Sequence, residues 1–318
     1  MRLSRVAPAV ALVALAIAAP RLVPSSYAAN ALVTLALYVV LALAFDLMAG
    51  HVGAVSLAAP AFYAIGAYTA GILATRYGAG FLVTLLAGIA LATLVAVVVG
   101  WPLFRLSDLA FAIGSLGLGL IAAALANNLT DLTGGAMCTT GVAPARLALG
   151  PVVLSTATPR AAYALAALLA GVALLAYLAL TTYRAGRTVA MVQGDEPLAA
   201  AFGVNPLRHK LTLFAASGAL TAAAGVFYAH YTTVVCPADF SPFLTINLLV
   251  MVFVGGPGSL GGVLLGVALF VGVAEAVRGF AHLGNLLFGL VLLLAVLALP
   301  RGLWGWVTGL TGRPRRAT

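Results

Sequence analysis

The chain has 318 residues, of which 64% are hydrophobic and 7% charged, with a mean hydropathy of +1.15 and a formal net charge of +9. Soluble domains are about half apolar and a quarter charged, so this composition excludes an ordinary soluble protein. It predicts an all-α integral membrane protein, because a lipid-exposed backbone must satisfy its own hydrogen bonds and each span needs about 20 apolar residues.

Long apolar runs follow one another along the whole chain and predict about ten transmembrane helices in a single domain, residues 1–318. They lie near residues 6–23, 29–48, 56–75, 81–101, 108–126, 160–181, 211–230, 242–255, 262–281 and 284–299. The first run has features of a secretory signal peptide, although its length and the span that follows favour a retained helix. The run at 242–255 is short and ends in Gly255-Gly256-Pro257-Gly258, which indicates a half-helix or re-entrant piece and leaves nine spans as the alternative.

The distribution of positive charge predicts the orientation of these spans. With a cytoplasmic N-terminus, eleven of the arginine and lysine residues fall on one side and five on the other. Positive residues in short loops favour the cytoplasm, so we expect both termini (N-in/C-in) and residues 183–210 inside and the loop 127–159 outside. The same bias explains the net charge without nucleic acid as a partner.

The chain lacks the sequence patterns of the common enzymes. No glycine-rich loop precedes its only lysine, Lys210, so no nucleotide-binding P-loop is present. The four histidines are scattered without metal-ligand spacing, and no nucleophile elbow occurs. We therefore expect no catalytic residue, metal or cofactor in this chain. Cys138 and Cys236 both fall outside, where a disulfide can form, but unpaired thiols are the favoured alternative because sequence cannot show that they meet.

The most polar stretch, Tyr183 to Lys210, interrupts the apolar sequence and has the pattern of a short cytoplasmic helix. Asp195 can cap a helix that begins with Glu196 and Pro197, since proline is tolerated in the first turn. Gly203 is expected to end it. A solvated connector is the alternative to a docking surface.

Within this stretch, Glu196, Ala199, Ala201 and Gly203 of GDEPLAAAFGVN resemble the loop by which permeases of ABC importers engage their ATPases. Four blocks in order further resemble the permeases of the branched-chain amino acid (leucine/isoleucine/valine) importer family, covering roughly residues 30 to 300. The blocks are Gly53 to Leu57 with Phe62 to Ala70, Phe111 to Ile113 with Asn128 to Gly135, Gly186 to Lys210, and Tyr228 to Tyr231 with Gly255 to Gly262.

The resemblance implies the membrane subunit of an ATP-driven importer for branched-chain or related amino acids, working by alternating access in a bacterial inner membrane. It implies a homologous permease partner, two cytoplasmic ATPase subunits that bind ATP and Mg²⁺, and a periplasmic binding protein that docks on residues 127–159. The expected ATPase contact comprises Arg187, Asp195, Glu196, Ala199, Ala201 and Gly203. Ala200, Pro197, Asp46 and Cys138 depart from the usual family pattern.

Glycine-rich blocks suit a translocation path, because small residues let helices approach and let backbone groups line a gap. The path residues we expect are Gly53, Ser56, Gly66, Tyr68, Gly258 and Ser259, with ordinary helix packing as the alternative.

Two carboxyl groups fall within predicted spans. Asp46 is expected near the cytoplasmic end of its span, within reach of water, and Glu275 three residues before Arg278, at a spacing that allows an ion pair. A secondary transporter or channel is the alternative function. It would need more intramembrane charges than this chain has.

Overall fold

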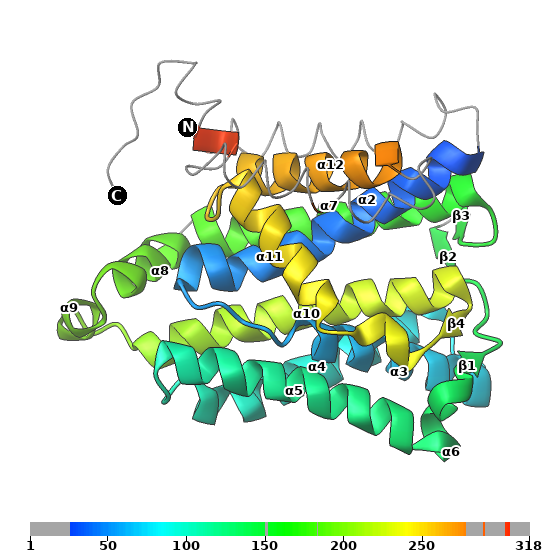
Figure 1. Ribbon diagram of the computed structural model, residues 1–318, viewed down its shortest axis with the longest axis horizontal. Coiled ribbons are helices and arrows are strands. Elements are labelled where there is room, and N and C mark those ends of the chain that lie inside the picture. Colours follow the sequence, from blue (N-terminus) through cyan, green and yellow to red (C-terminus); the bar gives the residue numbers. More distant parts are fainter. Residues whose placement is uncertain (1–25, 150–151, 183, 278–288, 290–302, 306–318) are drawn as a thin grey trace.

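The computed structural model describes residues 26–149, 152–182, 184–277, 289 and 303–305, and long helices make up most of this part (Figure 1). The α-helices are α2 (Ser26–Asp46), α3 (Ala59–Tyr77), α4 (Phe81–Leu103), α5 (Asp108–Asn128), α6 (Thr130–Thr133), α7 (Pro159–Thr182), α8 (Arg184–Gly194), α9 (Glu196–Ala201), α10 (Pro206–Thr232), α11 (Phe243–Gly255) and α12 (Leu260–Val277). A π-helical turn, η2 (Leu47–Val52), continues α2, and two 3-10 turns are η3 (Gly135–Met137) and η4 (Pro237–Phe240).

Within the described residues, six helices are long and apolar enough to cross a membrane: α2 with η2, α4, α5, α7, α10 and α12. Helix α3 has 19 residues and is largely buried by its neighbours. Helix α11 has 13 residues and ends at Gly255, in keeping with the half-helix predicted there. The predicted spans at 6–23 and 284–299 fall almost wholly outside the described residues, so ten spans and the N-in/C-in orientation stay predictions.

Two helices are interrupted by stretches of irregular backbone. After η2, residues 53–58 have no helical structure, and α3 begins only at Ala59 rather than at the predicted residue 56. The hydroxyl group of Ser115 on α5 accepts a hydrogen bond from the Leu57 amide at 2.9 Å. This bond gives the Leu57 amide an acceptor in place of the carbonyl group that a regular helix would supply. Non-helical backbone at membrane depth needs such protein partners. The second interruption, residues 256–259, separates α11 from α12.

Helix α10 lies in the centre of the helical layers and packs on α3, α4, α2 and α7. Small residues bring α10 and α3 together: a Cβ atom at Gly225 would lie 2.2 Å from the Tyr63 carbonyl oxygen, and one at Gly66 would lie 2.0 Å from that of Ala222. Close packing of small residues is a usual way for helices to associate in membranes. Lipid is as apolar as the side chains, so burying them between helices gains no hydrophobic free energy. Gly66 therefore has a packing role in this structure.

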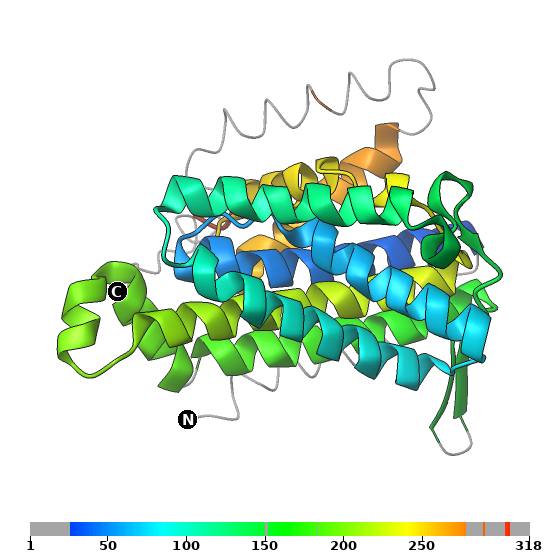
Figure 2. The same cartoon turned by 90° about the horizontal axis from the view of Figure 1, so that it is seen from below.

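The two ends of the molecule differ in structure. Helices α8 and α9 project from one end of the long axis, whereas the short strands lie at the other end (Figures 1 and 2). Strand β1 (Thr139–Thr140) pairs antiparallel with β4 (Val234–Val235), and β2 (Arg146–Leu149) pairs with β3 (Val152–Ser155). Three of these strands lie in the loop 127–159, and the apolar pattern of the chain gave no sign of them.

Candidate functional site

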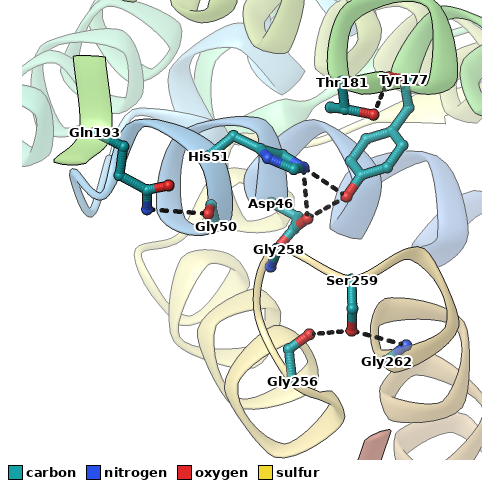
Figure 3. A network of polar contacts seen from close by, with 10 residues as sticks. All are labelled: Asp46, Gly50, His51, Tyr177, Thr181, Gln193, Gly256, Gly258, Ser259 and Gly262. Carbon is teal, nitrogen blue, oxygen red and sulfur yellow. Dashed lines mark hydrogen bonds and ion pairs between the residues drawn. The ribbon is translucent and has the colours of Figure 1, made fainter. Parts of the chain in front are cut away.

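A buried polar network surrounds Asp46, the last residue of α2, whose side chain is 0% exposed (Figure 3). Its Oδ1 atom accepts a hydrogen bond from the Gly258 amide (2.8 Å), and its Oδ2 atom accepts one from the Tyr177 hydroxyl (2.5 Å). His51 Nε2 lies 2.9 Å from the Tyr177 oxygen and 3.8 Å from Asp46 Oδ2. The expectation that Asp46 reaches water is therefore wrong, because α7 and the loop before α12 cover its carboxyl group.

The loop before α12 touches the backbone of η2. A Cβ atom at Gly50 would lie 2.3 Å from both the Gly258 nitrogen and Asp46 Oδ1, so only glycine fits there without displacing the loop. Gly258 itself has φ +72°, a conformation that favours glycine. Ser259 Oγ donates to the Gly256 carbonyl (2.8 Å) and accepts from the Gly262 amide (3.2 Å), which caps the start of α12. Gly258 and Ser259 thus form a tight turn anchored on Asp46.

The polar segment forms the helix that its sequence predicts. Helix α9 begins at Glu196 with Asp195 as its N-cap, and the Leu198 amide donates to Asp195 Oδ1 at 3.0 Å. Gly203 follows the helix with φ +79°, as expected for the residue that reverses the chain. An ion pair between Glu196 and Lys210 ties α9 to the start of α10.

One face of α9 is turned away from the rest of the chain. Ala199 is 1% exposed, whereas Leu198 is 54% and Phe202 is 70% exposed. Large apolar side chains that stand exposed on a polar segment are typical of a contact surface for another protein. Sequence reasoning had singled out the small residues of this helix and missed these two. Arg187 lies in α8, outside this exposed face.

A direct link joins this segment to the Asp46 network. The side-chain Nε2 of Gln193 on α8 donates a hydrogen bond to the Gly50 carbonyl oxygen at 3.2 Å (Figure 3). Gly50 in turn touches Asp46 and Gly258. Gln193 thus connects α8 to η2, directly beside the turn that begins α12.

The residues expected to line a translocation path lie in separate places. Gly53 is exposed beside Gln193, and Gly258 with Ser259 stands at the Asp46 network. Ser56 is buried in the irregular stretch before α3, where its hydroxyl accepts from the Ala58 amide at 3.4 Å. Tyr68 is buried on α3 farther along the bundle. Their role in transport stays a prediction.

At the other end, Cys138 and Cys236 are joined by a disulfide, with their Cα atoms 4.4 Å apart. The bond links two segments that are 98 residues apart in sequence, beside the β1–β4 pair. Sequence had left the pairing open and favoured free thiols, because nothing in the spacing shows that β1 and β4 meet.

Two adjoining cavities of about 230 and 240 Å³ lie at the same end, between α2, α3, α10, η4 and α12. Thr34 and Tyr38 line both of them. The first also has Tyr63, Tyr228, Tyr231 and Asp239 in its wall, so four tyrosines and a carboxyl group surround a space that is otherwise apolar. The sequence analysis missed these residues, since they come from four separate elements; the only local signal is the spacing of Tyr228 and Tyr231, which places them on one helix face.

Comparison with known proteins gives a consistent result. The family profile described as "Branched-chain amino acid transport system / permease component" matches residues 27–296. The chain is 31% identical to the high-affinity branched-chain amino acid transport system permease protein LivM of Escherichia coli (strain K12), over 92% of this chain and 73% of the relative. It is 30% identical to LivM of Salmonella typhimurium over the same shares of the two chains. No solved structure matches the chain.

Proposed function

The chain belongs to the branched-chain amino acid transport system permease family, and from this premise we propose that it forms the membrane path of an ATP-driven importer for branched-chain or related amino acids. A member of this family is a multi-pass membrane component of a transporter and not an enzyme. The observation that carries the proposal is the family match, which covers residues 27–296. In addition, the polar segment expected to contact the ATPases is folded into the helices α8 and α9. Transport then proceeds by alternating access between two arrangements of the helices.

Helix α9 is the proposed contact with the cytoplasmic ATPases, which bind ATP and Mg²⁺. The N-cap at Asp195, the Glu196–Lys210 ion pair and the reversal at Gly203 hold this short helix in one orientation. Leu198 and Phe202 then present exposed apolar surface to a partner, and large apolar side chains of this kind dominate the energetics of protein interfaces. The buried Ala199 lets α9 sit close to its neighbours, Ala201 is exposed beside the proposed contact surface, and Arg187 lies in the preceding helix α8.

The distribution of arginines supports a cytoplasmic position for α8 and α9 and an N-in/C-in arrangement in the bacterial inner membrane. The opposite end, with the loop 127–159 and the Cys138–Cys236 disulfide, then faces the oxidising periplasm. The disulfide and the strand pair β1–β4 tie this loop to the end of α10, which supports docking of a periplasmic binding protein there. Helices α4 and α5 expose rows of large apolar side chains, and these suit contact with lipid and with a homologous permease subunit.

Co-purification with the products of neighbouring genes tests this proposal. We expect the wild-type chain to bring down two ATPases, and the Leu198→Ala, Phe202→Ala double variant to lose most of them, since both side chains are exposed and their truncation leaves the fold intact. The matched control is Leu106→Ala with Leu109→Ala, which removes two exposed side chains, one in the loop between α4 and α5 and one in the first turn of α5. Uptake that persists after ATP depletion, without any bound ATPase, would show instead a transporter that works alone.

A further inference from the structure

The cavity between α2, α3, α10 and η4 combines aromatic rings with a single carboxyl group. Ring centroids of Tyr63 and Tyr228 lie 5.5 Å apart, and Tyr63 also packs against Phe240 at 5.6 Å. The Asp239 carboxyl group lines the same cavity as Tyr63 and Tyr228. The cavity has a volume of about 230 Å³, below the roughly 300–1,000 Å³ of pockets for drug-sized ligands, so it suits a small molecule.

Aromatic faces and a carboxylate together are the groups that recognise an organic ammonium ion. The faces attract the cation through the ring quadrupole, and this attraction strengthens when water is excluded. A carboxylate supplies the opposite charge that a cation needs at membrane depth. Among the residues that the structure describes, no arginine or lysine lines either cavity, so Asp239 has no basic side chain beside it in this part of the walls.

The remaining walls are suited to an aliphatic side chain. Val33, Leu37 and Leu41 of α2 and Leu244 of α11 give the cavity an apolar side. The adjoining cavity adds the polar groups of Asn30 and Glu275, and the Tyr231 hydroxyl on α10 donates a hydrogen bond to Asn30 Oδ1 at 3.0 Å. Tyr68, 7% exposed and packed on Phe240 at 5.4 Å, has no hydrogen-bond partner for its hydroxyl oxygen among the residues that the structure describes.

We propose that this cavity is the site in the membrane subunit that binds the transported amino acid, with its ammonium group between Asp239 and the rings of Tyr63 and Tyr228, and its aliphatic side chain against α2. The inference rests on the proposed function and gives that function a substrate site. It places the site at the disulfide end, where the amino acid arrives from outside. The class of ligand is a small aliphatic amino acid with a free ammonium group.

The structure fixes the position of Asp239 independently of any ligand, which makes a clean test available. Asp239 Oδ2 accepts a hydrogen bond from the Cys236 amide (3.1 Å), and Cys236 is held by the disulfide. Asp239→Asn keeps an acceptor for that amide and removes only the charge. Asp108→Asn is the matched control, because Asp108 is an exposed carboxyl group at the start of α5 that lines neither cavity.

Equilibrium binding of radiolabelled leucine is measured on the full chain in nanodiscs, with whatever subunits co-purify. We expect Asp239→Asn to weaken binding about ten-fold or more, and Asp108→Asn to leave it unchanged. Tyr228→Leu is expected to weaken binding similarly, whereas Tyr228→Phe keeps the ring and most of the affinity. The keto acid of leucine, which lacks the ammonium group, is not expected to compete.

Wild-type affinity in Asp239→Asn and Tyr228→Leu, competition by the keto acid, or no leucine binding by the wild-type chain would each overturn the proposed site. This readout does not depend on the ATPases. If leucine binds as expected but no ATPase accompanies the chain, the proposed importer function fails while the site stands. If ATPase and uptake are normal and the variants bind leucine like the wild type, the site fails while the function stands.

Discussion

Replacing Asp46 by alanine is expected to destabilise the protein far more than replacing it by asparagine. In the alanine variant, the Gly258 amide loses the acceptor at 2.8 Å, its only one in the described part of the chain. The Tyr177 hydroxyl loses its bond at 2.5 Å but keeps His51 at 2.9 Å. A buried donor left without a partner costs about 1–3 kcal/mol, so the total with the weakened tyrosine contact is about 2–4 kcal/mol. Asparagine keeps an acceptor for Gly258 and can donate to Tyr177, so its cost is under about 1 kcal/mol.

The assay is the apparent melting temperature of the purified protein in detergent, followed by intrinsic fluorescence. A change of 1 kcal/mol shifts the melting temperature of a large domain by about 2 °C, which predicts a loss of about 4–8 °C for alanine and little change for asparagine. An alanine variant as stable as the wild type would show that Asp46 does not hold the turn before α12. An asparagine variant as unstable as alanine would show that charge, and not hydrogen bonding, is what matters.

Three further predictions concern backbone packing and the disulfide. Gly225→Ala is expected to lower the free energy of unfolding by about 1–3 kcal/mol, because its Cβ atom would overlap a carbonyl oxygen of α3. Gly117→Ala is the control, since open space surrounds this glycine and the change should be neutral or stabilising. Melting curves compare the two variants. Ser115→Ala leaves the part-buried Leu57 amide of the irregular stretch without its acceptor and should cost about 1 kcal/mol in the same assay. Replacing Cys138 and Cys236 by serine removes the disulfide. In the chain-entropy model, a cross-link between residues 98 apart contributes up to about 4–5 kcal/mol to the free energy of unfolding, so the variant should be less stable by that amount. Protease resistance, compared with that of the oxidised wild type, measures the loss.

Hydropathy predicted the class of fold and most of the helices, because the bilayer demands long apolar runs wherever the chain crosses it. It also showed that 242–255 is too short for a full span, and α11 has 13 residues. Hydropathy could not reveal the irregular stretch at 53–58, because those residues are as apolar as a helix and the partner that stabilises them, Ser115, is remote in sequence.

The local signals of the polar segment were reliable, since capping by Asp195 and chain reversal at Gly203 depend on neighbouring residues alone. Features that depend on distant parts of the chain were not accessible. Asp46 is buried by groups more than 130 residues away, and Asn30 and Tyr231 meet across a separation of 201 residues. One sequence gives no measure of such distances, so the cavity, the disulfide and the burial of Asp46 came only with the structure.

The retention of a buried carboxyl group in so apolar a chain has a physical explanation in the broken helices. Where helical structure is interrupted inside a packed bundle, backbone donors lose their intrahelical acceptors and need partners from elsewhere in the protein. At the first interruption, residues 53–58, the Ser115 hydroxyl group accepts a hydrogen bond from a backbone amide. At the second, residues 256–259, the Asp46 carboxyl group on another helix accepts one from the Gly258 amide. The hydrogen bonds at both interruptions therefore run between elements rather than within one helix. Gln193 connects that same region to the segment that carries α9, so the polar side chains of this bundle stand where a rigid helix would otherwise be.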